Sequence, residues 1–302
     1  AKNGLTSVNE AKIYEFNTVS FTEDGTFESA KDKMDKIKKL GFNAIEIMPV
    51  ENTYSFNWGY DGVDKLAPSE HLGGPDQLKD FVDYAHKTGL NVIMDMVPNH
   101  LGPDGAQLKQ TGPYISHPNN FGEAFNFEGE NSKYVRDYMV NAALNWLDNY
   151  HCDGIRFDMT KFMESDFTMK QIAAEINYHK PDAFLIAEDA RNDARVTTPL
   201  HPQEYGKNKK EDVHAHAINE ISNNNVSTHN LGFDSEWDFP YHKQIAALML
   251  EYWCGYPKSI AAFDRVVRNS EQRVKYAMSH DEIGNIDGTR LITKIFAQEI
   301  NI

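Results

Sequence analysis

Short, almost wholly apolar runs alternate with longer amphipathic segments along the chain, and this alternation constrains the fold more than any other feature. The apolar runs have the length of buried strands and lie at residues 12–16, 43–48, 91–97, 154–158, 183–187, 232–237 and 274–278. The amphipathic segments have apolar residues three or four positions apart, as in helices, and lie at residues 29–40, 75–88, 132–150, 169–179 and 241–251. Strands that are apolar on both faces and joined by helices are typical of a parallel sheet covered by helices.

Seven such strands in 302 residues favour an eightfold barrel over an open doubly wound sheet. We therefore predict an α/β protein, a single (β/α)8 TIM barrel over residues 1–302, with a loop insertion at about 99–131 after the third strand. The eighth unit is missing from this pattern. Either the chain ends before that unit, or residues 291–302 close the barrel in a reduced form.

The charge and composition of the chain exclude several classes of partner. The formal net charge is −15, whereas nucleic-acid binding depends on clustered Lys and Arg, so no nucleic-acid partner is expected. No window approaches 18 uncharged apolar residues, so no membrane span is predicted, and residues 1–12 lack the apolar core of a signal peptide. Cys152 and Cys254 have no metal-ligand spacing and are expected to be free thiols. A neutral polar substrate fits this charge best.

Polar side chains gather where the predicted strands end, and in a β/α barrel these carboxyl ends meet on one face. The residues that follow the strands are Trp58, Tyr60, Asp61, Asp95, Asn99, His100, Arg156, Asp158, Glu188, Asp189, His280, Asp281 and Glu282. Each has a plain structural interpretation: a lone Asp at a strand end is usually a cap, Arg156 can be an ion-pair partner, and His280 a core histidine. Several carboxylates brought to one face would repel one another, however, and burying them costs free energy unless Arg and His compensate. The combination therefore indicates a functional site.

This mixture of residues suits the cleavage of an acetal, which needs one ionised carboxylate and one protonated carboxylic acid. Arg156 lies two residues before Asp158 and is expected to hold it ionised as the nucleophile. Glu188 is expected to keep its proton beside the negative charge of Asp281, which in turn would bind sugar hydroxyls. Tyr60 offers a flat face to a pyranose, and His100 and His280 offer donors. Retaining chemistry requires that the two carboxyl groups lie about 5–5.5 Å apart.

Four sequence motifs, in order, resemble the conserved regions of glycoside hydrolase family 13, the α-amylase family: DMVPNH (Asp95 to His100), GIRFD (Gly154 to Asp158), LIAED (Leu185 to Asp189) and SHDEIGN (Ser279 to Asn285). A fifth match, NWGYDGV (Asn57 to Val63), resembles the segment whose tyrosine stacks on the sugar. The resemblance runs from about residue 12 to 290. It implies a (β/α)8 barrel and retention of the α configuration. By position it implies Asp158 as nucleophile, Glu188 as acid/base and Asp281 as transition-state stabiliser.

The same resemblance implies that Tyr60, His100, Arg156 and His280 line the subsite where the bond breaks, with Trp58, Asp61 and Lys161 also binding substrate. Lys161 fits the lysine of the α-amylases, but Phe162 replaces a histidine that is common in the family. Around residues 72–105 and 122–158, and at RNDAR after Glu188, the sequence looks most like maltooligosyltrehalose trehalohydrolases and glycogen branching enzymes. Those relatives are usually cytoplasmic and calcium-independent, so a cytoplasmic enzyme without cofactor or metal is expected. Their flanking β-sandwich domains are not found in these 302 residues.

Three functional hypotheses follow. The first is a retaining glycosidase acting on α-1,4-glucans or maltooligosaccharides, like a trehalohydrolase or an α-amylase. The second is a 1,4-α-glucan branching enzyme, in which the same residues transfer the glucan to a sugar instead of water. The third, a non-catalytic glucan-binding fragment, is disfavoured by the intact set of carboxylates. Chain-length preference, linkage preference and oligomeric state are left open by the sequence.

Overall fold

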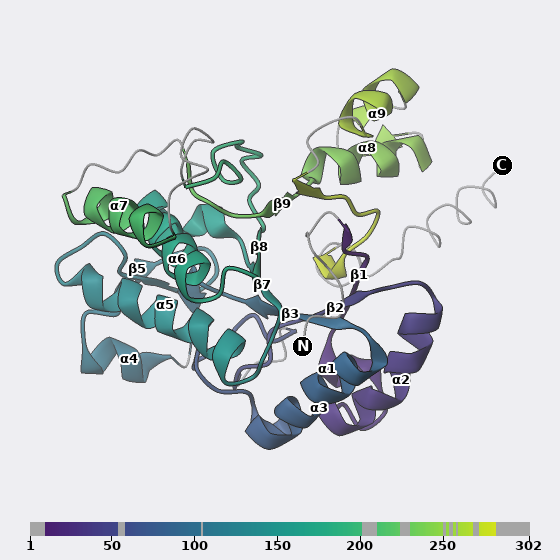
Figure 1. The fold of residues 1–302 in the computed structure, drawn as a ribbon, viewed down its shortest axis with the longest axis horizontal. Helices are drawn as coiled ribbons and strands as arrows, with labels where there is room; N and C mark the ends of the chain where they lie inside the picture. The colour runs from purple at the N-terminus through teal and green to yellow at the C-terminus, as the bar shows by residue number, and fades with distance from the viewer. Residues whose placement is uncertain are drawn as a thin grey trace.

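The computed structural model describes residues 10–53, 58–103, 105–200, 210–223, 230–249, 252–253, 256–257, 259–267 and 272–281. In this part of the chain a seven-stranded parallel sheet has the order β1-β2-β3-β7-β8-β9-β12 and curls into a half-barrel (Figure 1). Its strands are β1 (Ile13–Phe16), β2 (Ala44–Ile47), β3 (Asn91–Met96), β7 (Gly154–Phe157), β8 (Phe184–Ala187), β9 (Ser235–Trp237) and β12 (Arg273–Val274). All seven predicted strands are confirmed. The seventh, β12, overlaps the predicted range 274–278 only at its last residue, Val274.

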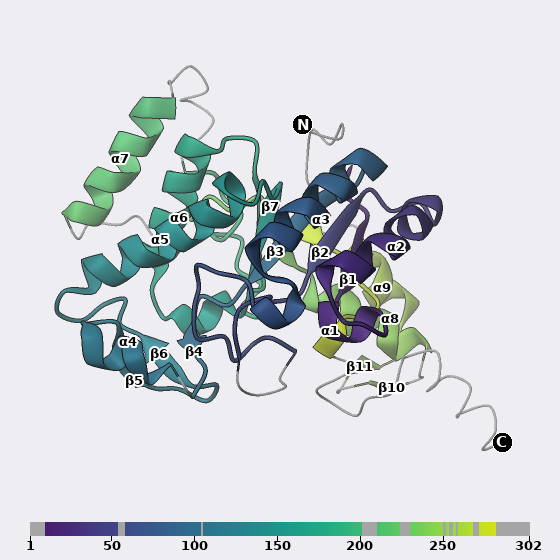
Figure 2. The same cartoon turned by 90° about the horizontal axis from the view of Figure 1, so that it is seen from below.

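Helices cover the outer surface of the sheet (Figures 1 and 2). Four of them contribute buried residues to the main core, and these are α2 (Phe27–Lys39), α3 (Gly74–Thr88), α5 (Ser132–Asp148) and α6 (Asp166–His179). Thr26 and Ser29 form a capping box that begins α2, and Gly89, with φ of 85°, ends α3 in the left-handed conformation that glycine adopts without strain. The apolar faces of these helices join the outward side chains of the strands in the main core.

Along the strands, the side chains that point into the curl of the sheet change from apolar to ionisable toward the carboxyl end. The site therefore lies at the carboxyl ends of the strands. Ala44 and Ile93 belong to a small apolar cluster inside the curl, together with Phe184, Ile186 and Trp237. Because alternate residues of a strand face the same side, the next inward positions on the same strands are Glu46 and Asp95. The carboxyl ends of the strands therefore enclose charged groups above an apolar floor.

The segment at 99–131, which was predicted as a loop insertion, contains regular secondary structure. It contains β4 (His100–Leu101), α4 (Ala106–Thr111), β5 (Ile115–Pro118) and β6 (Glu123–Phe125), and the three strands form an antiparallel sheet of order β4-β6-β5 beside the carboxyl end of the main sheet (Figure 2). The predicted helix at 241–251 is confirmed as α8 (Phe239–Met249). Sequence analysis did not foresee α1 (Thr18–Phe21), α7 (Lys210–Ser222), α9 (Ile260–Val267) or the short hairpin of β10 (Tyr252–Trp253) and β11 (Tyr256–Pro257).

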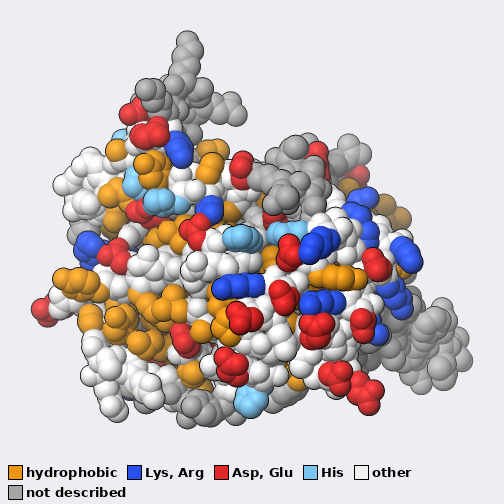
Figure 3. Space-filling model, turned by 60° about the horizontal axis from the view of Figure 1, so that its bottom comes forward, with side chains coloured by type: hydrophobic (Ala, Val, Ile, Leu, Met, Phe, Trp, Pro, Cys, Tyr) orange, Lys and Arg blue, Asp and Glu red, His pale blue; other side chains and the backbone are white. Residues whose placement is uncertain are grey.

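The segment that follows β12 contacts β1, the strand at the other edge of the sheet. His280 follows β12, and its ring Nδ1 lies 2.7 Å from Oε1 of Glu15 on β1. The predicted closing segment, residues 291–302, and Cys254 lie outside the described residues. Cys152 is a buried free thiol. Within the described residues no helix is long and apolar enough to cross a membrane. On the face in Figure 3, acidic and basic side chains are interspersed on one side and hydrophobic side chains gather on the other.

Candidate active site

Arg156 lies at the centre of the candidate site, on β7, and its side chain is 0% exposed. Its Nη1 donates to Oδ1 and Oδ2 of Asp95 at 2.7 and 2.8 Å and to Oδ1 of Asp158 at 3.0 Å. Its Nη2 donates to Oε2 of Glu188 at 2.6 Å. The guanidinium carbon also lies 4.5 Å from the ring centroid of Trp237. One fixed cation therefore binds three carboxyl groups from three neighbouring strands.

Asp158 follows β7 directly and has a donor at each carboxyl oxygen. Arg156 binds Oδ1, and Nδ2 of Asn99 donates to Oδ2 at 3.1 Å and to the backbone carbonyl of Asp158 at 2.9 Å. The side chain of Asp158 is 10% exposed, whereas that of Arg156 is 0% exposed. Both oxygens accept a hydrogen bond from a fixed donor, and the side chain is still open to an incoming atom. These are properties of a nucleophilic carboxylate.

Glu188 follows β8, and its environment favours the protonated form. Burial raises its pKa to about 8, against the lowering effect of Arg156, and the charges of Asp158 and Asp281 raise it further. The backbone N–H of Met159 donates to Oε2 at 3.0 Å and fixes the carboxyl group. The direction foreseen from sequence is confirmed, but burial contributes more than the neighbouring Asp281. At neutral pH this group can donate a proton.

The two carboxyl groups needed for acetal cleavage thus occupy different environments around one guanidinium. Asp158 binds Nη1 and Glu188 binds Nη2, so both face the same small region. This arrangement is compatible with the separation of about 5–5.5 Å that retaining glycosidases use.

Tyr60 forms one wall of the region and is 9% exposed. Its hydroxyl donates to Oδ2 of Asp95 at 2.5 Å, and its ring stacks on the His280 ring with centroids 4.9 Å apart. Burial raises the pKa of Asp95 to about 6, against the effect of Arg156. Tyr60 is therefore held by a hydrogen bond on one side and a ring contact on the other.

His280 lies beside Tyr60, and Asp281 follows it in the chain. Oδ1 of Asp281 is 3.5 Å from Nε2 of His280, and the Asp281 side chain is 34% exposed. Asp281 lies close enough to Glu188 for its charge to raise the pKa of that group. The structure therefore brings together Asp158, Glu188 and Asp281, the three predicted catalytic residues.

His100 and Asp61 join this site through Asn99. Nδ1 of His100 lies 2.5 Å from Oδ1 of Asn99, whose amide binds Asp158. Nε2 of His100 lies 3.9 Å from Oδ1 of Asp61. Burial lowers the pKa of His100, so a neutral ring is favoured.

Trp58 and Lys161 were predicted to bind substrate. Trp58 is half-buried beside Met48, Tyr60 and Val97, with φ of 55°. Lys161 is exposed on the short helix η3 (Thr160–Met163), with its ammonium 5.8 Å from the ring centroid of Phe162. Their binding roles stay predictions.

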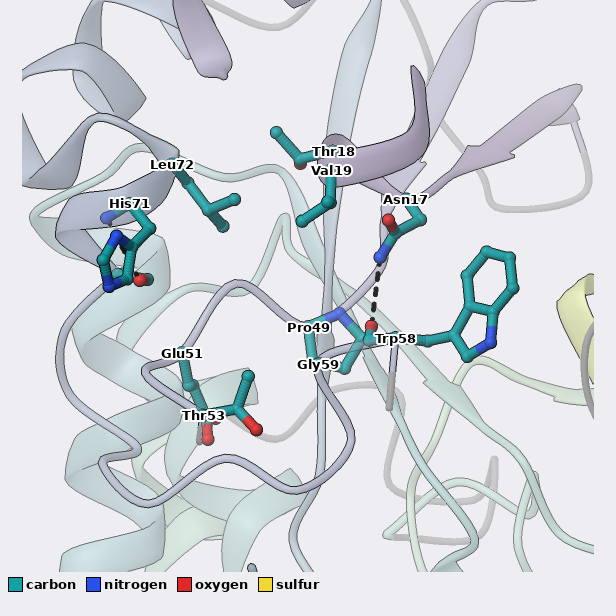
Figure 4. A pocket seen from close by; sticks show the side chains of 11 residues that line it. Asn17, Thr18, Val19, Pro49, Glu51, Thr53, Trp58, Gly59, His71 and Leu72 are labelled. Atoms are coloured by element: carbon teal, nitrogen blue, oxygen red, sulfur yellow. Dashed lines mark hydrogen bonds between the residues drawn. The ribbon is translucent and has the colours of Figure 1, made fainter. Parts of the chain in front are cut away.

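A cavity of about 250 Å³ lies behind Trp58, between α1 and the segment that follows β2 (Figure 4). Asn17 donates to the backbone carbonyl of Trp58 at 3.1 Å, and the indole points away from the other lining side chains. Asp158, Glu188 and Asp281 are not among the residues that line it. This cavity is separate from the candidate site.

Two acids near the site, the half-buried Glu15 and the buried Glu46, were missed by sequence reasoning. Glu15 binds His280, and Glu46 is 2% exposed with Oε1 unpaired among the described residues. Burial raises the pKa of Glu46 well above its ordinary value. A signal was available: each is a charged residue at an inward position of an otherwise apolar strand. Within the described residues, no group of three or more His, Cys, Asp or Glu side chains is placed to hold a metal ion.

Comparison with known proteins identifies relatives of this chain. Residues 12–121 match the catalytic domain of alpha amylase. Malto-oligosyltrehalose trehalohydrolase of Saccharolobus solfataricus is 33% identical over 308 residues, which are 95% of this chain and 52% of the relative. The 1,4-alpha-glucan branching enzyme GlgB of Pseudoalteromonas atlantica is 31% identical over 198 residues, or 54% of this chain and 27% of the relative. These trehalohydrolase matches cover most of this chain, but this chain spans only about half the length of the trehalohydrolases.

Solved structures share the fold. A Salmonella typhimurium protein provisionally named an alpha amylase has a TM-score of 0.72 and 28% sequence identity, covering 97% of this chain and 52% of that one. The family match, the relatives and this structural neighbour agree with one another. The chain therefore belongs to the α-amylase family, glycoside hydrolase family 13.

Proposed function

We propose that this protein cleaves α-1,4-linked glucans or maltooligosaccharides with retention of configuration, through two successive displacements. The observation that carries the proposal is the shared guanidinium of Arg156, which binds Asp158 and Glu188 on adjacent nitrogens. Burial then separates the two by keeping the proton on Glu188, whose pKa is about 8.

In the first displacement, an oxygen of Asp158 attacks the anomeric carbon while Glu188 gives its proton to the glycosidic oxygen. The glycosidic bond breaks, the shortened glucan leaves as an alcohol, and a glycosyl ester of Asp158 remains. In the second, the Glu188 carboxylate takes a proton from water and the resulting oxygen attacks the same carbon. Asp158 leaves as a carboxylate, and Glu188 regains its proton.

The other predicted residues would bind the sugar whose bond is broken. Tyr60 supplies the flat apolar face, and Asp281 accepts hydrogen bonds from hydroxyls that carry more positive charge in the oxocarbenium-like state. His280, His100 and Arg156 line the same ring, and Trp58, Asp61 and Lys161 contact its neighbours. No step in this scheme needs a cofactor or calcium.

The acceptor in the second displacement decides between hydrolysis and branching. The similarity to malto-oligosyltrehalose trehalohydrolase extends over 95% of the chain, whereas that to the branching enzyme extends over 54%. We therefore favour water as the acceptor, and maltooligosaccharides or their trehalose-capped forms as substrates. Branching is the second candidate, because a named branching enzyme is 31% identical. A cytoplasmic location is proposed from the same relatives.

The deciding experiment compares products from maltoheptaose, amylose and a trehalose-capped maltooligosaccharide by chromatography. A trehalohydrolase releases trehalose and an α-amylase releases reducing ends, whereas a branching enzyme lowers iodine staining of amylose without new reducing ends. Asp158→Asn and Glu188→Gln should each reduce turnover by roughly 10³-fold or more. Asp83→Asn, at a fully exposed aspartate, is the matched control. Glucan binding with no turnover in the unaltered protein would refute the proposal and favour a binding module.

A further inference from the structure

Glu15 on β1 and His280, which follows β12 in the chain, form a two-point contact. Oε1 of Glu15 lies 2.7 Å from the ring Nδ1 of His280, and Oε2 accepts a hydrogen bond of 2.9 Å from the backbone N–H of the same residue. The His280 side chain is 6% exposed and that of Glu15 19% exposed. One carboxyl group therefore fixes both the ring and the backbone at position 280.

The surroundings of His280 add constraints on its ring. The ring lies 4.9 Å from that of Tyr60, at 20° to it, and 6.4 Å from that of Trp237. Burial opposes a charge on the ring, but the hydrogen bond and charge of Glu15, together with Asp281, raise the pKa of His280 to about 9. Burial likewise acts against the charge of Glu15, yet His280 and Arg156 lower its pKa. The charged or titratable groups that face this pair are Glu46, Tyr60, Arg156 and Asp281.

We propose that Glu15 is a positioning residue for the reaction, acting through His280 and Asp281. The Glu15 carboxylate occupies Nδ1, so only the Nε2–H of the imidazolium can be donated toward Asp281 and the sugar. The second oxygen fixes the peptide nitrogen next to Asp281, and thereby the direction in which Asp281 projects. This inference rests on the proposed function, since it assigns Glu15 to the same site.

The positioning role of Glu15 needs both the negative charge and the length of its side chain. An amide lacks the charge, and a shorter acid lacks the length. A glutamine can accept one hydrogen bond but supplies no negative charge to stabilise the imidazolium. An aspartate keeps the charge but is too short to hold Nδ1 and the backbone N–H together. The two substitutions therefore separate the charge of Glu15 from its reach.

The test is an NMR titration of ¹⁵N-imidazole-labelled protein, with the His280 signals assigned by their loss in His280→Gln. We expect the imidazole to titrate near pH 9 in the unaltered protein and at least about one pH unit lower in Glu15→Gln. In Glu15→Asp the pKa should stay above that of the glutamine variant. We expect kcat on maltoheptaose to fall about tenfold or more in both variants, with KM changing less than kcat.

Glu51→Gln is the control for a purely structural effect. Glu51 is a buried acid whose cationic partner is Lys65 and not His280, since its Oε2 accepts a 2.7 Å bond from Lys65 Nζ. It should lower the melting temperature and leave the His280 titration unchanged. If Glu15→Gln also lowers only the melting temperature, and leaves both kcat and the imidazole pKa unchanged, the positioning role is wrong. If the unaltered protein turns over no glucan, the proposed function fails, and the titration together with maltoheptaose affinity decides the inference independently.

Discussion

Among single residues, Arg156 has the largest expected effect, because its guanidinium has no exposure and binds Asp95, Asp158 and Glu188. Arg156→Met would leave these carboxyl groups without their cation. Removing one partner of a buried ion pair typically costs about 3–5 kcal/mol. We expect a loss of this size in urea unfolding at neutral pH. The loss should be smaller at pH 5, where the orphaned carboxyl groups can take up protons, and larger at pH 8.5.

Arg136→Met is the matched control for this variant. Arg136 is partly buried and donates to the backbone carbonyl of Phe127, the hydroxyl of Ser132 and the amide oxygen of Gln171, and within the described residues no carboxylate forms an ion pair with it. It should cost roughly 1–2 kcal/mol, with little dependence on pH. A loss in Arg156→Met that is equally insensitive to pH would contradict the account of the three carboxyl groups.

At the same scale, some site residues could be predicted from sequence and others could not. Asp158 and Glu188 directly follow apolar strands, so parallel topology alone places them together. The expected pairing of Arg156 with Asp158 is present, but Arg156 also binds Asp95 and Glu188, which depends on the curvature of the sheet. Glu15 was missed because its partner is 265 positions away, and no local pattern links the two.

At the scale of elements, strands that are buried on both faces were readily predicted, because their residues form continuous apolar runs. The strands β4, β5 and β6 were not, since they are two to four residues long and are stabilised by pairing with one another rather than by their own composition. Helix α7 was also missed: of its thirteen residues only Ala217 and Ile221 are buried, so its apolar periodicity is weak.

The spacing between β7 and β8 depends on Gly154, which begins β7. A Cβ there would lie 2.7 Å from the backbone oxygen of Phe184 on β8, which cannot move without disturbing the sheet. Gly154→Ala should therefore cost about 1–3 kcal/mol and shift Arg156 relative to Glu188, reducing kcat. Thermal unfolding and kinetics would measure both effects.

Gly41→Ala provides a contrast for Gly154→Ala. Gly41 has φ of 95° but no atom within 4 Å of an added Cβ, and it lies at the end of α2. Its substitution should cost about 1 kcal/mol through backbone strain alone and leave kcat unchanged. Equal losses of kcat in the two variants would show that the distance between β7 and β8 does not control the site.

At the scale of the whole molecule, the curl of the sheet gathers ionisable groups whose protons are held more tightly in the folded state. Burial raises the pKa of Asp95 to about 6, of Glu51 and Glu236 to about 7, and of Glu188 to about 8. Glu15 raises the pKa of His280 to about 9, against the effect of burial. The molecule also has a formal net charge of −15, which adds self-repulsion as the pH rises. All these effects lower the stability of the folded state as the pH rises.

The sign of the resulting pH dependence follows from proton binding. Between about pH 4 and 9 the folded state binds more protons at these groups than the unfolded chain, so stability falls as the pH rises. Glu15 and Asp189 have lowered pKa values, so their contribution is lost only below about pH 4. We expect the melting temperature to be higher at pH 5.5 than at pH 9 by roughly 5 °C or more.

Scanning calorimetry with and without 1 M NaCl separates the two sources of this pH dependence, because salt screens surface repulsion far more than it affects buried groups. A decline that disappears in salt would assign the effect to net charge and not to the buried carboxyl groups. If the buried groups are responsible, the decline persists in salt, and Glu188→Gln flattens it between the ordinary glutamate pKa of 4.5 and about 8. The same variant has no acid/base, so a flatter stability profile together with lost turnover would identify one proton on Glu188 as the source of both.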